Sequence, residues 1–374
     1  VGAGLLLRSL GALLSMDPGY RADHVVVTNM QSWQYFPTPE SRVEFVRQAS
    51  ERLRGLPGVE RVGMTSALPL SVPIGLERAR VTVEGTSIAP GDELPAVRAT
   101  STTSGFFETL KIPVVRGRLF DETDVAGSTR VILVNASFAR QFFGDANPIG
   151  KHVKFGFMDA PVDREIVGIV GDVRHEGLQV APGPSVFLPH TQAPTGALHF
   201  VMRVTGDPAS YERQVRSTFA QLNRSMPLNT VSSLETLLTQ SLRQRRFQLG
   251  LLAAFSIPAL LLSAIGIYGV MSRATSERTH EIGVRLAVGA GRSDVRRMVL
   301  RSGGMLALAG VSAGTLLALV LTRYMRGMLY DVTPLDPVTF VSAAGGLMFV
   351  AIVASLVPAI RASSVDPVVA LRND

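Results

Sequence analysis

Three long stretches without a charged residue dominate the C-terminal third of this 374-residue chain. They cover residues 247–271, 303–322 and 338–360. Each holds about 20 residues or more, the length that a helix needs to cross a hydrocarbon core of about 30 Å. One charge at the centre of such a helix costs about 2.5–3.5 kcal/mol on insertion scales, so its absence predicts three membrane-spanning helices. The alternative, three buried helices of a large soluble protein, is disfavoured because arginines flank the stretches.

The charged residues between these stretches predict the side of the membrane on which each loop lies. The loop at 272–302 contains seven arginines and three acidic residues, whereas the loop at 323–337 contains two arginines and two aspartates. Because short cytoplasmic loops are enriched in Lys and Arg, we expect the first loop inside the cell and the second outside. Everything before residue 247 is then outside. Membrane topology accounts for the net charge of +7, and no nucleic-acid partner is expected.

The chain begins with Val1 inside an apolar run that extends to about residue 14. We interpret residues 1–20 as the outer end of a further, truncated transmembrane helix in a longer gene product. Arg8 would lie near the outer interface of the membrane, where a long side chain can extend its charge into water.

Residues 21–235 are predicted to form a mixed α/β domain. Strand–helix–strand patterns occur at 24–65 and again at 198–231, on either side of a segment at about 100–195. This arrangement predicts a split βαβ subdomain that carries an inserted subdomain. The expected fold class is therefore an α+β membrane protein, with a helical bundle of three complete spans and a fragment of a fourth.

The remaining residues, 236–374, are assigned to a stalk helix and the transmembrane domain. Residues 232–235, Ser-Ser-Leu-Glu, fit a capping box at the start of a helix. That helix is expected to continue without a break into the first full span. A continuous helix would join the outer domain rigidly to the membrane.

Several short patterns resemble catalytic motifs without their chemistry. Residues 144–151 end in Gly-Lys but lack the spacing of a phosphate-binding loop and its final Ser or Thr, so a turn at Gly150 is expected instead. Gly310 and Gly314 match a nucleophile-elbow string, but they lie inside a predicted span and are interpreted as helix-packing positions. The six histidines are scattered and are assigned surface or turn positions, and cysteine is absent. We expect no catalytic residue, cofactor or metal ion.

The arginine-rich loop also carries a family resemblance. Residues 277–290, ERTHEIGVRLAVGA, closely resemble the coupling-helix signature of MacB/FtsX permeases of ABC transporters. The tail at 358–372 resembles the ending of that family, and the segments at 105–110 and 168–173 resemble its periplasmic domain. The opening, at 2–9 and 17–20, resembles the middle of the branch that carries two such units in one chain. The chain would then be the C-terminal half of a duplicated permease.

The resemblance implies a site where an ATPase docks. The coupling positions that it implies are Arg278, Glu281, Ile282, Gly283, Arg285 and Gly289. Glu281 and Arg285 lie four residues apart, so they share one face of a helix and could pair with each other or with the partner. From the residues alone, a solvated segment that only sets topology and contacts lipid headgroups is favoured over a coupling element.

The function implied is that of a permease subunit in the inner membrane. It would couple ATP hydrolysis by a separate cytoplasmic ABC ATPase to movement of its periplasmic domain, for export or mechanotransmission. Its other expected partners are a second permease unit or copy, the lipid bilayer and a periplasmic protein. The alternative is a membrane-anchored periplasmic interaction or regulatory protein without transport activity. An enzyme in its own right has little support, because the ATPase motifs are absent from the sequence.

Overall fold

The computed structural model describes residues 1–69, 78–83, 95–156, 161–241, 243–278, 281–282, 284, 288, 291–322 and 335–363. The chain divides into two compact units. One, called here the α/β domain, comprises Met16–Leu242, and the other, called the helical unit, comprises Val1–Ser15 and Arg243–Asp374.

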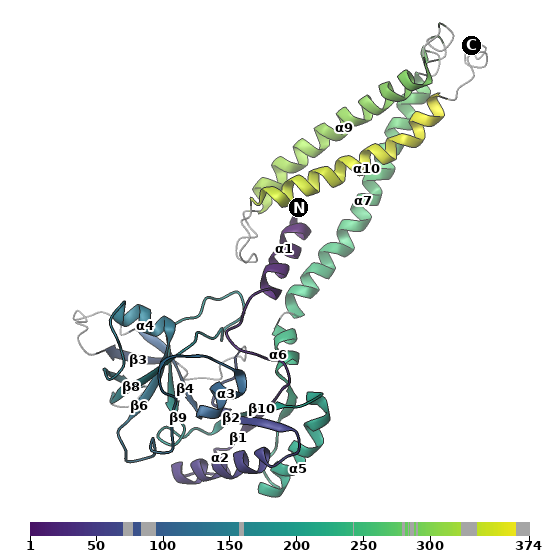
Figure 1. The fold of residues 1–374 in the computed structure, drawn as a ribbon. Coiled ribbons are helices and arrows are strands. Elements are labelled where there is room, and N and C mark those ends of the chain that lie inside the picture. The colour runs from purple at the N-terminus through teal and green to yellow at the C-terminus, as the bar shows by residue number, and fades with distance from the viewer. Residues whose placement is uncertain are drawn as a thin grey trace. The chain divides into compact units, whose positions relative to one another are not determined.

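The first part of the α/β domain is a twisted sheet in the strand order β11-β1-β10-β2 (Figure 1). The strands are β1 (Val25–Gln31), β2 (Val59–Thr65), β10 (Ala197–Val204) and β11 (Thr230–Ser233). Strand β10 is antiparallel to both β1 and β2, so β1 and β2 are parallel with β10 between them. Strand β11 is antiparallel to β1 on its other side, and β10 and β11 are therefore also parallel. Two strand–helix–strand units are thus interleaved in one sheet.

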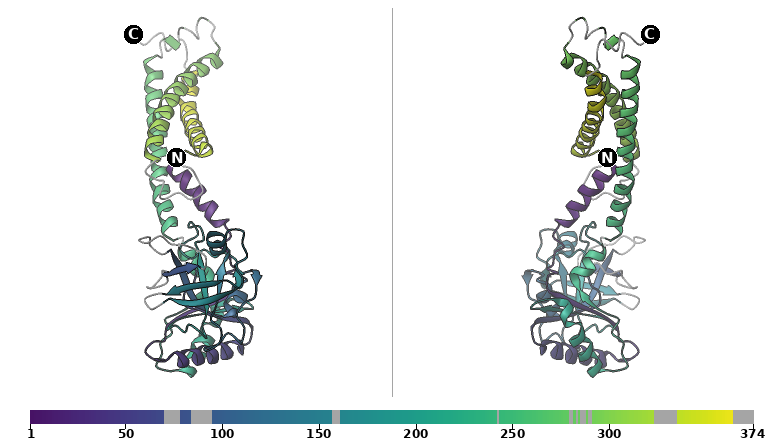
Figure 2. Two further views of the ribbon diagram at one scale, coloured as in Figure 1. Left: turned by 90° about the vertical axis from the view of Figure 1, so that its left-hand side faces the viewer. Right: turned by 90° about the vertical axis from the view of Figure 1, so that its right-hand side faces the viewer.

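Two helices cover one face of this sheet, as Figures 1 and 2 show. They are α2 (Pro39–Arg54) and α5 (Glu212–Leu222), which follows the short 3-10 helix η1 (Pro208–Tyr211). Thr38 caps α2 by accepting a hydrogen bond from the Ser41 amide, and proline occupies the first helical position, where its missing N–H costs nothing. Phe45 of α2 packs on Phe200 of β10 and Phe219 of α5, which ties both helices to the sheet.

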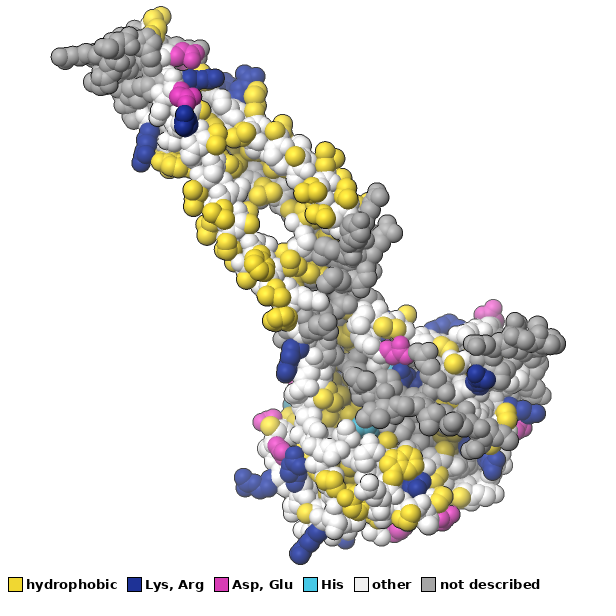
Figure 3. Space-filling view, turned by 180° about the vertical axis from the view of Figure 1, so that it is seen from behind, with side chains coloured by type: hydrophobic (Ala, Val, Ile, Leu, Met, Phe, Trp, Pro, Cys, Tyr) yellow, Lys and Arg dark blue, Asp and Glu magenta, His cyan; other side chains and the backbone are white. Residues whose placement is uncertain are grey.

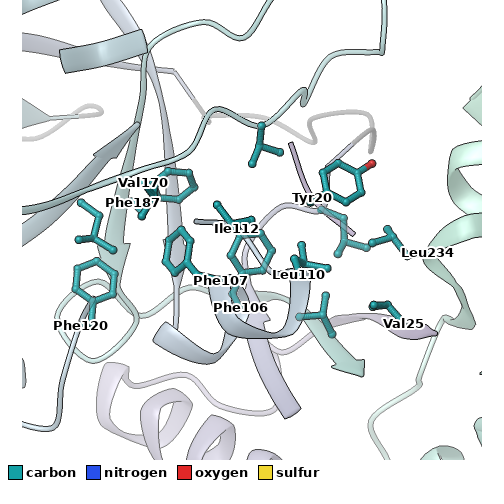
Figure 4. Close-up of a cluster of buried hydrophobic side chains, with 14 of the residues drawn as sticks. Tyr20, Val25, Phe106, Phe107, Leu110, Ile112, Phe120, Val170, Phe187 and Leu234 are labelled. Atoms are coloured by element: carbon teal, nitrogen blue, oxygen red, sulfur yellow. The ribbon is translucent and has the colours of Figure 1, made fainter. Parts of the chain in front are cut away.

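The opposite face of the sheet packs against α3 (Ser104–Leu110). Figure 4 shows the core there, in which Phe106, Phe107 and Leu110 lie among side chains from the strands. Helix and sheet approach so closely that a Cβ added at Gly63 would lie 2.2 Å from the backbone nitrogen of Phe106. Glycine is therefore required at this contact.

The second part of the α/β domain is a ring of paired strands. The strands are β3 (Arg78–Val83), β4 (Ala96–Thr102), β6 (Val131–Asn135), β7 (His152–Gly156), β8 (Val162–Val170) and β9 (Ser185–Pro189), and β5 (Val114–Gly117) pairs on the edge of β8. Each of the six pairs with the next around the order β4-β3-β7-β8-β6-β9, and β9 pairs back with β4. Val81, Ile132, Val153 and other apolar side chains fill the core, which α4 (Ala136–Phe143) covers through Phe138. The ring includes β3, which precedes the expected start of the insertion at residue 100.

The helix that leaves the domain, α6 (Leu234–Ser241), starts one residue later than the capping box predicts. Ser233, not Ser232, accepts the hydrogen bond from the Thr236 amide, and Ser233 is the last residue of β11. The expected continuity of this helix into the first span depends on Leu242, which lies outside the described residues.

The helical unit contains α1 (Gly2–Leu14), α7 (Arg243–Glu277), α9 (Arg292–Leu321) and α10 (Pro337–Ser363). Helices α7, α9 and α10 are long and apolar enough to cross a membrane, and they contain the three predicted stretches except for Thr322, which follows the last residue of α9. Their large apolar side chains face outward, as Figure 3 shows along this unit, and Phe255 and Val341 are among the most exposed. A surface of this kind is stable in lipid and unstable in water.

Candidate functional site

The segment between α7 and α9, residues 278–291, is called here the coupling segment. Its described residues include two hydrogen bonds with helical spacing. The Ile282 amide donates to the Arg278 carbonyl over 2.9 Å, and the Val288 amide donates to the Val284 carbonyl over 3.0 Å. Gly283, Arg285 and Gly289 lie outside the described residues, so the expected pairing of Glu281 with Arg285 remains a prediction.

Ile282 anchors this segment to the helical unit. Its side chain is 2% exposed and packs in one cluster with Met271 of α7, Val295 and Val299 of α9, and Ala359 of α10. The cluster that buries Ile282 therefore includes residues from all three long helices. Burying such a side chain contributes about 1.5–3 kcal/mol, so the segment is fixed to the bundle.

The described residues of the coupling segment also include two exposed valines. Val288 is 83% exposed and Val284 is also exposed, as are Arg278 and Glu281. The two valines were not among the predicted site residues, although their spacing of four residues was a visible signal.

Polar contacts join the helix ends close to the coupling segment. Arg361 of α10 donates to the Tyr268 hydroxyl of α7 over 3.0 Å. Arg296 of α9 donates to the Ser363 hydroxyl of α10 over 2.9 Å. Together with the Ile282 cluster, these contacts link α7, α9 and α10 where the arginines gather.

A different ion pair lies at the start of α10. Arg8 of α1 pairs with Asp336, which also accepts hydrogen bonds from the amide and the hydroxyl of Thr339. The bonds from Thr339, with the nearby guanidinium of Arg8, hold the pKa of Asp336 below its usual value. The sequence predicted the outer side for both Arg8 and the loop that contains Asp336, and this side stays a prediction, although the ion pair brings the two residues together.

The predicted packing positions, Gly310 and Gly314, do not pack on described residues of this chain. A Cβ added at either glycine would meet no described atom within 4 Å. They line two open hollows on the helical unit of about 390 and 360 Å³. The close helix approach lies instead at Gly303 of α9, where an added Cβ would be 2.6 Å from the Ser355 hydroxyl of α10.

The histidine prediction is wrong for part of the set. His175 and His190 of the α/β domain are buried, with 7% and 2% exposure. Burial lowers the pKa of His175 to about 3 and that of His190 to about 4.

The described residues contain no cluster of three side chains able to hold a metal ion. The Gly144–Lys151 loop is a turn as predicted, with Gly150 at φ +79°.

Two family models match the chain. The model of the MacB-like periplasmic core domain matches residues 8–231, and the model of the FtsX-like permease C-terminal matches residues 253–367. The first match alone covers more than half of the chain. The chain belongs to the MacB/FtsX family of permeases. The α/β domain is thus a MacB-like core, and the coupling segment lies within the FtsX-like part.

Named relatives of this permease are exporters. It is 28% identical over 306 residues to a macrolide export ATP-binding/permease protein, MacB, of Agrobacterium fabrum, covering 77% of this chain and 46% of that protein. It is 27% identical over 280 residues to a pyoverdine export ATP-binding/permease protein, PvdT, of Pseudomonas aeruginosa, covering 72% and 41%. The chain therefore spans less than half the length of these relatives.

Among solved structures, the periplasmic region of MacB from Actinobacillus actinomycetemcomitans is similar to the permease. The match has 14% sequence identity and a TM-score of 0.40, and it covers 61% of this chain and 97% of that one.

Proposed function

We propose that this permease couples ATP hydrolysis by a separate cytoplasmic ATPase to movement of its α/β domain. The observation that carries the proposal is the coupling segment. Ile282 is buried in a cluster with residues from three helix ends, while Val284 and Val288 are exposed. Exposed valines four residues apart are costly in water and suit a hydrophobic groove on a partner.

The contacts around the coupling segment support transmission of force. A partner that moves the segment would move Ile282 and thereby the ends of α7, α9 and α10 together. Arg361 and Arg296 bond across the same helix ends and would resist their separation. Helix α7 follows α6 in the sequence, so movement would reach the α/β domain along the chain.

The names of the relatives support the need for an ATPase. These relatives are ATP-binding/permease proteins, and this chain matches less than half of each. The ATPase would come from a cytoplasmic partner, and this chain would itself catalyse no reaction. A second permease unit or copy would complete the membrane part, and Gly310 and Gly314 are proposed packing positions for it.

The proposed location is the inner membrane, with the α/β domain in the periplasm. The charge pattern of the loops and the apolar surfaces of α7, α9 and α10 support it. Export of a substrate and mechanical work on a periplasmic partner are both compatible with this arrangement.

The test is co-purification of the full-length permease from its own membranes, with a Val284→Asp/Val288→Asp variant beside the wild type. We expect an ATPase to co-purify with the wild type and to be lost from the variant. The matched control is Val341→Asn, which changes an exposed valine of α10 away from the coupling segment. Gel filtration establishes that each variant is folded. Equal recovery of the ATPase with the wild type and the double variant would exclude the valines as its docking surface.

A further inference from the structure

Two arginines lie on one face of α9 where its uncharged stretch begins. Arg297 and Arg301 are four residues apart in a continuous helix, so their side chains are neighbours. Val299, between them in the sequence, is buried in the cluster that contains Ile282. At 100° per residue, both arginines lie about 160° around the helix from Val299, and both are exposed. Their face of α9 therefore points away from the described helices.

The length of α9 places this arginine pair at the boundary of a bilayer. Residues 302–321 follow Arg301 without a charge. About 20 helical residues span about 30 Å, which is the thickness of a hydrocarbon core. Arg301 then lies at the edge of the core, and Arg297, about one turn further, lies among the lipid headgroups.

The described part of the chain does not balance the charges of this pair. Neither arginine side chain has an ion pair or a hydrogen bond with a described residue. The nearest acidic residue in the sequence, Asp294, accepts a hydrogen bond from the Gly291 amide over 3.2 Å at the start of α9. By contrast, Arg273 of α7 donates to Glu277 over 2.9 Å. Because like charges four residues apart on a helix repel each other, an anion between the two arginines would stabilise them.

An apolar surface continues from the arginines along the same face. Leu308 lies about 180° around the helix from Val299, and Leu308 and Met305 are each 58% exposed. Gly304 lies between Arg301 and Leu308, and a Cβ added to it would meet no described atom within 4 Å. The face thus joins two cations to an uncovered apolar strip, with no side chain where the two meet.

We propose that Arg297 and Arg301 bind the phosphate of an anionic phospholipid, whose acyl chain lies against Leu308. Guanidinium groups suit a phosphate, because two N–H donors can contact two of its oxygens. A zwitterionic lipid fits less well, since its ammonium group would lie beside two cations. Clusters of basic residues at helix ends recognise anionic headgroups in this way. The proposal requires α9 to cross a membrane but does not depend on docking of an ATPase.

The test places a tryptophan beside the expected acyl chain. Leu308→Trp is reconstituted in vesicles of phosphatidylcholine and phosphatidylglycerol, with bromine on the acyl chains of one lipid at a time. Brominated chains quench a tryptophan that they contact, so the two quenching curves give the relative affinity of the two lipids. The wild-type chain, whose single tryptophan is Trp33 in the α/β domain, measures the background.

The matched control is Ile265→Trp on α7. Ile265 is exposed and lies eight residues from Arg273, as Leu308 lies seven from Arg301, so the two tryptophans have similar depths. Arg273, however, is already paired with an acidic side chain. We expect phosphatidylglycerol to be preferred about threefold or more at Leu308→Trp, and about equally with phosphatidylcholine at Ile265→Trp.

Removal of both arginine charges tests the headgroup contact. Arg297→Gln/Arg301→Gln, made in the Leu308→Trp chain, should abolish the preference, and five other arginines remain at 272–302 to set the topology. The proposal is overturned if neither tryptophan position prefers phosphatidylglycerol, or if the preference survives in the glutamine variant. An equal preference at both positions would show only a general attraction of the arginine-rich end for anionic lipid, and would also overturn it.

Discussion

Mild acid should destabilise the α/β domain through the buried His175 and His190 and the partly buried His199. Burial lowers the pKa of His175 to about 3 and those of His190 and His199 to about 4, whereas an unfolded histidine titrates near 6.5. Between these values the unfolded chain binds protons that the folded chain does not. Stability therefore falls as the pH falls below 6.5.

The size of the effect follows from the pKa differences. From pH 7.5 to pH 5.5, each histidine lowers the free energy of unfolding by about 1.3 kcal/mol, and the three together by about 4 kcal/mol. That is a large part of the 5–15 kcal/mol that typically stabilises a domain. Carboxylates contribute little in this range, because their unfolded pKa values lie near 4.

Urea unfolding of the α/β domain, residues 16–242, at the two pH values measures this difference. His190→Gln should reduce the loss of unfolding free energy between pH 7.5 and pH 5.5 by about a third, to about 2.7 kcal/mol. Its own destabilisation cancels, because each variant is compared with itself at the other pH. Thr230→Ala, an exposed change that does not titrate, should leave the loss unchanged. A loss below about 1 kcal/mol in the wild type, or an unchanged loss in His190→Gln, would refute the reasoning.

Three further predictions concern packing. Ile282→Ala should lower the stability of the helical unit by about 2–4 kcal/mol and release the coupling segment, so that a protease cuts this segment faster than in the wild type. Equal rates of cleavage in the variant and the wild type would show that Ile282 does not hold the segment in place. Gly303→Val should disrupt the contact of α9 with α10 and lower the thermal midpoint in detergent, whereas Gly310→Val should not. A lower midpoint for Gly310→Val than for Gly303→Val would contradict the placement of the close helix contact at Gly303. Arg8→Gln and Asp336→Asn should each lower the thermal midpoint, and the midpoint of the double variant should be no lower than that of either single variant, because the pair is already broken by one change. Losses that add in the double variant would show that the two residues do not act as a pair.

Much of the fold was predictable because its signals are local. Charge-free length located the three long helices, and the strand–helix–strand pattern at 24–65 located β1, α2 and β2. The ring of strands was only partly predictable. Strands such as β4 and β9 are short, and their pairing joins segments almost 90 residues apart, which no local pattern records.

The candidate site was likewise predictable only in part. The family motif located the coupling segment, but it did not distinguish the buried Ile282 from the exposed Val284 and Val288, because only the helices around the segment decide which face is covered. For His175 the sequence held no signal of burial. Its surroundings come from β4, 77 residues earlier at Arg98, and from the chain before β9.

The most direct test of coupling is a distance measurement across the ATP cycle. The chain contains no cysteine, so a spin label can be placed at Thr230→Cys in the α/β domain, and distances between two copies can be measured by pulsed electron resonance. In membranes that contain the ATPase, we expect the distances to change between the nucleotide-free and ATP-bound states. The change should disappear in Val284→Asp/Val288→Asp. Identical distances in both nucleotide states of the wild type, or the same change in the variant, would contradict the proposed coupling.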